Sequence, residues 1–108
     1  MTDKTWKQFE RRIAKRVGGR RLGPTGTDTA DVVSSWLVVE CKHRSTLPAW
    51  VQEALDKARR NAEPDQLGLA VLHEKGTRDV DSLVVLSLGD FLAWFDPVPR
   101  GPDKGPTA

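Results

Sequence analysis

The stretch Ala30–Lys42 reads ADVVSSWLVVECK, and it decides the fold that this sequence predicts. Two valine-rich runs, residues 29–33 and 36–42, flank the pair Ser34-Ser35, which is typical of two strands joined by a tight turn. Strands of this composition belong in a core, yet charged side chains stand at both ends of this hairpin. Burying a charge without a partner is costly, so the charges call for an explanation.

The pleat of the hairpin predicts where these charges point. Side chains alternate between the two faces of a strand, so Glu40 and Lys42 share one face. If the turn has two residues, Val33 pairs with Trp36, and Asp31 becomes a diagonal neighbour of Glu40, roughly 7–8 Å away at the backbone. A three-residue turn would instead send Asp31 to the opposite face. Cys41 is expected to face away from the charges as a buried thiol.

A third carboxylate belongs to a helix predicted over residues 3–17, which Gly18-Gly19 should end. Its apolar residues recur at three- and four-residue steps and are Trp6, Phe9, Ile13 and Val17. At 100° per residue, Glu10 falls on this apolar face and not among the lysines and arginines. A glutamate there needs a partner. The alternatives are a buried ion pair with Lys42 or an arginine, and a metal site shared with Asp31 and Glu40.

Three converging carboxylates favour the metal site. Hard oxygen ligands suit Mg²⁺, with Mn²⁺ as a substitute. A lysine beside such a cation, here Lys42, can orient or deprotonate water or neutralise charge that develops on a phosphate. The hairpin is therefore interpreted as core scaffolding with one charged face that builds a catalytic site.

The rest of the chain predicts an α/β domain. The further elements are a short strand over 20–22, a helix over 48–62, strands over 67–73 and 83–86, and a short helix after a cap formed by Ser87 and Asp90. This order predicts one domain over residues 1–96, with three layers around a mixed β-sheet. Residues 97–108, rich in proline and glycine, are expected to form a flexible tail.

The composition and the charge distribution limit which kinds of partner this protein can have. The chain has 108 residues, a net charge of +2 and one cysteine, which excludes an internal disulfide and a cysteine-based zinc site. We expect a reducing cytoplasm and no membrane association, because no apolar run approaches the ~20 residues of a membrane helix. Residues 1–21 hold eight basic and two acidic groups, a local +6. This asymmetry indicates DNA or RNA as a partner, or else a solvated helix face.

The motif Asp31, eight residues, then Glu40-Cys41-Lys42 resembles the signature of the PD-(D/E)XK nucleases, with Ala30 in place of the usual proline. The leading helix with Glu10, the glycine-rich loop and the helix LPAWVQEALDKARRNA resemble archaeal-type Holliday junction resolvases and their small phage-encoded relatives. The resemblance covers roughly residues 5–95 and implies a restriction-endonuclease-like core. It implies a homodimer that cuts branched DNA, such as a four-way junction, and leaves 5′-phosphate and 3′-hydroxyl ends.

The resemblance also assigns roles to residues. It makes Asp31, Glu40 and the backbone carbonyl of Cys41 metal ligands, and Glu10 a ligand directly or through water. Lys42 would position the attacking water. We further expect DNA contacts from the basic groups of the first helix and the adjoining loops, with His43 and Arg44 either on phosphate or solvated. These DNA-binding candidates are Lys4, Lys7, Arg11, Lys15, Arg20, Arg21, His43 and Arg44.

Overall fold

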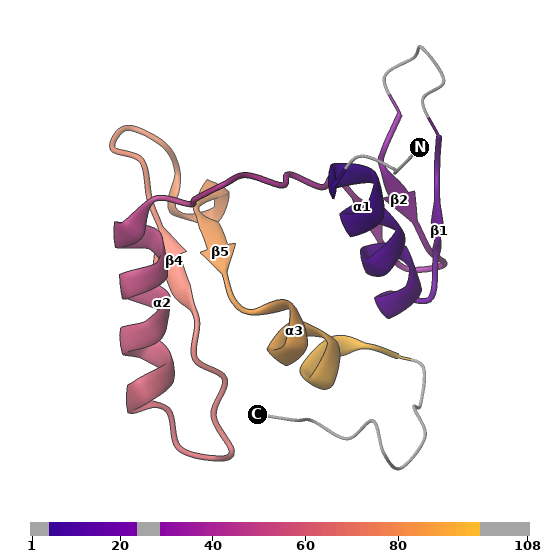
Figure 1. Ribbon diagram of the computed structural model, residues 1–108. Coiled ribbons are helices and arrows are strands. Elements are labelled where there is room, and N and C mark those ends of the chain that lie inside the picture. The colour runs from indigo at the N-terminus through magenta and orange to yellow at the C-terminus, as the bar shows by residue number, and fades with distance from the viewer. Residues whose placement is uncertain (1–4, 24–28, 98–108) are drawn as a thin grey trace. The chain divides into compact units, whose positions relative to one another are not determined.

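The computed structural model describes residues 5–23 and 29–97, and within them the elements follow the predicted order (Figure 1). They are α1 (Thr5–Arg16), β1 (Arg20–Arg21), β2 (Val32–Val33), β3 (Val38–Val39), α2 (Ala49–Asn61), β4 (Ala70–Leu72), the 3₁₀ helix η1 (Asp79–Asp81), β5 (Leu83–Val85) and α3 (Leu88–Phe95). The prediction of a mixed α/β protein is confirmed. No helix in these two ranges is long and apolar enough to cross a bilayer.

The chain divides into two compact units, residues 1–45 and residues 46–108. The first holds an antiparallel sheet in the order β1-β2-β3, and the second holds the antiparallel pair β4-β5. The predicted single mixed sheet is therefore not formed by the described strands. Each of them pairs with its neighbour in sequence, because short connections favour antiparallel pairs, and only the α2 connection is long enough for a parallel one.

In the first unit, α1 lies alongside β1 and β2 (Figure 1). Its apolar stripe buries Ile13 and Val17 against Val32, which is completely buried. Trp6, predicted for the same stripe, is instead 41% exposed, because it lies in the first turn of the helix. The core of this unit is therefore small.

The two glycines after α1 end the helix as predicted. Gly18 adopts a left-handed φ of 68°, a conformation that glycine reaches without steric cost. The N–H of Gly19 donates to the carbonyl of Ala14 at 2.8 Å. A Cβ on Gly19 would overlap the carbonyl of Val33. The second glycine therefore allows the chain to enter β1 directly beside β2.

The register of the hairpin differs from the predicted one. Val33 pairs with Val38, and Val32 with Val39, so the predicted pair of Val33 with Trp36 is wrong. The shift moves the turn one residue along the chain, to Ser35 and Trp36.

The side chain of Ser34 explains this shift. Its hydroxyl accepts hydrogen bonds from the backbone N–H groups of Trp36, at 3.3 Å, and Leu37, at 3.1 Å. The N–H of Ser34 donates to the carbonyl of Leu37 at 2.9 Å. Serine stabilises turns in this way, so Ser34 flanks the turn instead of lying inside it.

In the second unit, α2 lies alongside β4 and buries Leu55 and Ala70. A Cβ on Gly68 would lie 2.8 Å from the Cα of Arg59, so glycine allows the close approach of this segment to the helix. The predicted cap of α3 is confirmed, since the Ser87 hydroxyl accepts from the N–H of Asp90 at 3.1 Å. Of the predicted tail, residues 98–108 lie outside the described residues.

Candidate metal and catalytic site

Asp31 meets the Glu-X-Lys segment at the open end of the β2–β3 hairpin. Its backbone N–H donates to the carbonyl of Val39 at 3.0 Å. Its carboxylate oxygen Oδ2 accepts a hydrogen bond from the N–H of Cys41 at 2.8 Å. The strand β3 ends at Val39, so this contact does not depend on the alternation of faces that the sequence predicted. Asp31 is therefore fixed to the backbone between Glu40 and Lys42.

Glu40 and Lys42 form an ion pair next to this contact. The distance from Lys42 Nζ to Glu40 Oε2 is 3.2 Å, and the side chains of Lys42 and Glu40 are 63% and 57% exposed. An exposed pair of this kind is held weakly, by about 0–1 kcal/mol. Both side chains can therefore rearrange when a ligand arrives.

Glu10 is buried, as the helical spacing predicted. Its Oε1 lies 2.7 Å from Nε of Arg21, and the two side chains are 8% and 16% exposed. The ion pair with an arginine, one of the two alternatives, is thus the arrangement observed. Arg21, which is predicted to contact DNA, neutralises Glu10 here, and its guanidinium lies 5.8 Å from the centre of the Trp6 ring.

The thiol of Cys41 lies within the field of all three predicted carboxylates. Burial raises its pKa first, and the negative charges of Asp31, Glu10 and Glu40 raise the pKa further. The prediction of a buried thiol is wrong, because Cys41 is half-buried. The strand alternation from which Cys41 was expected to face away from the charges stops before residue 40.

The predicted ligands are chemically suited to a hard divalent cation, but their spacing in this structure does not form a metal site. Carboxylates and a backbone carbonyl are the ligands that Mg²⁺ and Mn²⁺ take. Within residues 5–23 and 29–97, however, no three histidine, cysteine, aspartate or glutamate side chains stand close enough together to hold a metal ion. Glu10 is paired with Arg21, which leaves Asp31, the exposed Glu40 and the Cys41 carbonyl as the candidate donors.

The predicted DNA-binding residues that the structure describes all lie in the first unit. Arg11, Lys15, Arg20 and Arg44 are exposed. Lys7 is half-buried, with its Nζ 5.5 Å from the centre of the Trp6 ring. Lys4 lies outside the described residues.

Aromatic contacts around α1 were missed by the sequence analysis. His43 packs its ring against Phe9 with 5.2 Å between centroids, and the Arg12 guanidinium lies 5.7 Å from the Phe9 ring. Phe9 and Arg12 stand three residues apart on one helix, a spacing that brings side chains together and could have revealed this contact.

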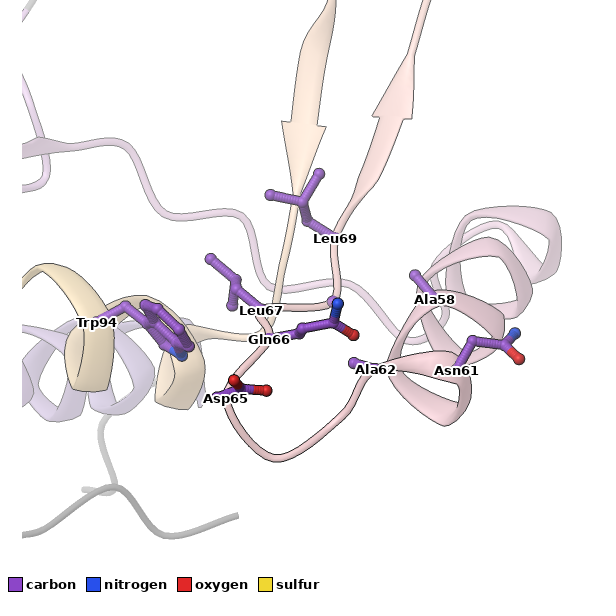
Figure 2. Close-up of a pocket in the computed structure, with 9 residues that line it drawn as sticks. Ala58, Asn61, Ala62, Asp65, Gln66, Leu67, Leu69 and Trp94 are labelled. Carbon is purple, nitrogen blue, oxygen red and sulfur yellow. The ribbon is translucent and has the colours of Figure 1, made fainter.

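A shallow depression in the second unit offers much less chemistry. It has a volume of about 560 Å³ and lies between the end of α2, with Ala58 and Ala62, and Trp94 of α3 (Figure 2). Asp65 is its one ionisable side chain. A single carboxylate without a base or a nucleophile does not form a catalytic site.

No protein-family model, no curated protein and no solved structure matches this chain. The residues and their geometry therefore carry the functional interpretation.

Proposed function

We propose that this protein is a metal-dependent DNA endonuclease of the PD-(D/E)XK type that hydrolyses phosphodiester bonds in branched DNA. The observation that carries the proposal is the 2.8 Å hydrogen bond from the Cys41 N–H to the Asp31 carboxylate. It brings the aspartate of the motif to the middle residue of Glu40-Cys41-Lys42 across ten positions of sequence. An aspartate and a Glu-X-Lys segment at one end of a hairpin are the arrangement that this chemistry needs.

Asp31, Glu40 and the Cys41 carbonyl would hold Mg²⁺, or Mn²⁺ in its place. The cation would polarise the phosphate and lower the pKa of a bound water. Lys42 positions the attacking water and neutralises charge on the phosphate. Glu10 can join the site, directly or through water, once Arg21 is drawn away by the negative charge of the DNA.

The phosphate backbone would run along the basic residues of the first unit. Arg11 and Lys15 on α1 and Arg20 on β1 are exposed and belong to the segment with a local charge of +6. Such groups bind DNA through the release of counterions, without reading its sequence. Arg21 would join this set when it leaves its partner Glu10.

The proposal includes the wider properties that the resemblance implies. The chain would act as a homodimer, in which each subunit cuts one strand of a four-way junction. A cytoplasmic location fits DNA as the substrate.

A cleavage assay tests the function. A labelled four-way junction, a linear duplex of the same arms and a supercoiled plasmid are incubated with the protein in Mg²⁺ or EDTA. Cleavage of the junction that requires Mg²⁺ and is lost in Asp31→Asn supports the proposal. Cleavage of every duplex indicates a nicking or restriction-like nuclease of the same type. Cleavage that persists in EDTA or in Asp31→Asn contradicts the assigned site.

A DNA-binding module without catalytic activity is the second candidate. The Glu10–Arg21 pair favours it, because a permanently neutralised Glu10 cannot serve a metal. A gel shift of the junction with no cleavage in Mg²⁺ or Mn²⁺ would identify this alternative.

A further inference from the structure

We propose that Trp6 stacks on an unpaired DNA base beside the scissile phosphate, so that the preferred substrate is branched DNA with unpaired bases at the branch point. This inference rests on the proposed function and narrows its substrate class. The residues that carry it are Trp6, Phe9 and His43 with the cations around them, here called the aromatic surface.

Trp6 has the properties of a stacking platform. Its side chain is 41% exposed although it stands on the apolar stripe of α1, where Ile13 and Val17 are buried. Two cations lie near the ring: the guanidinium of Arg21 is 5.8 Å from its centre and Nζ of Lys7 is 5.5 Å from it. Tryptophan has only two side-chain torsions, so it loses little conformational entropy when a base stacks on it.

The aromatic surface adjoins the predicted catalytic lysine. His43 follows Lys42 directly in sequence, and its ring contacts Phe9, which stands three residues after Trp6 on the same helix. This contact links α1 to the segment after β3. A base on Trp6 would therefore have its phosphate near Lys42.

Charge identifies a nucleic acid as the occupant. Lys7 and Arg12 lie beside the aromatic rings, and the first unit carries ten basic against five acidic residues, a net charge of +5. Exposed aromatic rings interleaved with cations are the recurring composition of surfaces that bind unpaired bases. A fully paired duplex keeps its bases inside the stack and offers this surface only phosphates.

The magnitude of the effect follows from known stacking energies. One base stacked on an aromatic side chain contributes about 1–3 kcal/mol, which corresponds to about 5–150-fold in affinity. Phenylalanine in place of Trp6 keeps a stacking face, whereas alanine removes it. Trp94 provides a matched control, because it is 50% exposed but belongs to the second unit.

The test measures binding by fluorescence anisotropy in EDTA, so that cleavage does not interfere. The probes are a junction with a short unpaired gap at its centre and the fully paired junction of the same sequence. We expect the wild type to prefer the gapped junction. Trp6→Ala should lose about 5–150-fold on the gapped probe and less than about twofold on the paired one. Trp6→Phe should retain most of the preference, and Trp94→Ala should change neither affinity.

Equal losses of Trp6→Ala on both probes, or no loss on either, would overturn the inference. Thermal unfolding of Trp6→Phe and Trp6→Ala separates a loss of stacking from a loss of fold. The same preparations are then assayed for cleavage in Mg²⁺. If the protein cleaves DNA but Trp6→Ala keeps the wild-type probe preference, the base-stacking inference is wrong and the proposed function stands. If the probe preference changes as expected but no DNA is cleaved, the proposed nuclease activity is wrong and base stacking stands.

Discussion

The two units of this chain carry opposite net charges, and they differ in how deeply their carboxylates are buried. Residues 1–45 hold ten basic and five acidic groups, a net +5, whereas residues 46–108 hold seven and ten, a net −3. The acid-rich unit nevertheless shows no cluster of potential metal ligands within its described residues, 46–97. Its Asp79 and Asp81 lie in an exposed turn, while Glu10 and Asp31 of the basic unit are buried or half-buried. The burial of the carboxylates, and not their number, distinguishes the unit that contains the candidate site.

The ion pairs of the two units show the same contrast. Glu10 and Arg21 are held at 2.7 Å and are nearly buried, whereas Arg59 and Asp90 are 3.4 Å apart with more exposed side chains. A buried charge must keep a partner, while an exposed one has water. Paired substitutions, one in each unit, can therefore test this comparison.

The largest difference is expected in catalysis. Glu40→Gln and Lys42→Ala should each lower the rate of junction cleavage about 10²–10⁴-fold, because each removes a group positioned at the reacting phosphate. The matched changes Glu74→Gln and Lys75→Ala, on exposed residues of the second unit, should leave the rate unchanged. Single-turnover cleavage measures all four. If the cleavage rate of Lys42→Ala falls less than tenfold, Lys42 is only an ion-pair partner of Glu40 and not a catalytic group.

Stability should separate the two ion pairs next. Glu10→Gln leaves the Arg21 guanidinium nearly buried without a charge partner, which should lower the free energy of unfolding by about 1–3 kcal/mol. Arg59→Gln, in the more exposed pair, should cost less than about 1 kcal/mol. Urea denaturation gives both values. Equal costs would mean that the Glu10–Arg21 pair is not a structural element of the first unit.

Salt dependence of DNA binding should differ between the two helices. Neutralising Arg11 and Lys15 on α1 should reduce the slope of log K against log salt by about one unit per lost phosphate contact. The same change at Lys57 and Arg60, both exposed on α2, should leave the slope unaltered. Binding isotherms at several salt concentrations decide this. Equal slopes in both double variants would place the DNA on another surface.

The smallest effect concerns Cys41, the single cysteine of the chain. The carboxylate of Asp31 raises the pKa of this thiol, so Asp31→Asn should lower the pKa and increase the thiolate fraction at mildly alkaline pH. Alkylation by iodoacetamide should then be faster than in the wild type. Burial is the larger cause and remains, so the pKa should stay above that of an ordinary cysteine. Glu74→Gln is the control, and a slower reaction in Asp31→Asn would contradict the placement of the carboxylate.

Local signals in the sequence predicted most of the elements. The periodic apolar residues predicted the ends of α1 and α2 to within two residues, and the Ser87–Asp90 cap predicted the start of α3. The burial of Glu10 followed from its helical position, and the approach of Asp31 to Glu40-Cys41-Lys42 followed from the hairpin.

Features that depend on a choice between similar partners escaped prediction. The hairpin register depends on the Ser34 hydroxyl, which accepts hydrogen bonds from the backbone of the turn. A turn with these bonds and a turn without them differ little in energy, so the sequence does not distinguish the two registers. Several lysines and arginines have side chains long enough to reach Glu10, and sequence spacing does not show which of them pairs with it. The predicted mixed sheet required pairing across α2, a non-local contact for which local patterns give no evidence.

Iron-directed cleavage of the protein itself tests the central claim, that the hairpin of the first unit holds the metal. Fe²⁺ in place of Mg²⁺, with ascorbate and peroxide, produces radicals that cut the backbone next to the bound ion. We predict cuts beside Asp31 and Glu40-Cys41 that disappear in Asp31→Asn, persist in Glu74→Gln and are suppressed by excess Mg²⁺. Cuts confined to the acidic turn of Asp79 and Asp81, or a pattern unchanged in Asp31→Asn, would contradict the assignment of the metal to this hairpin.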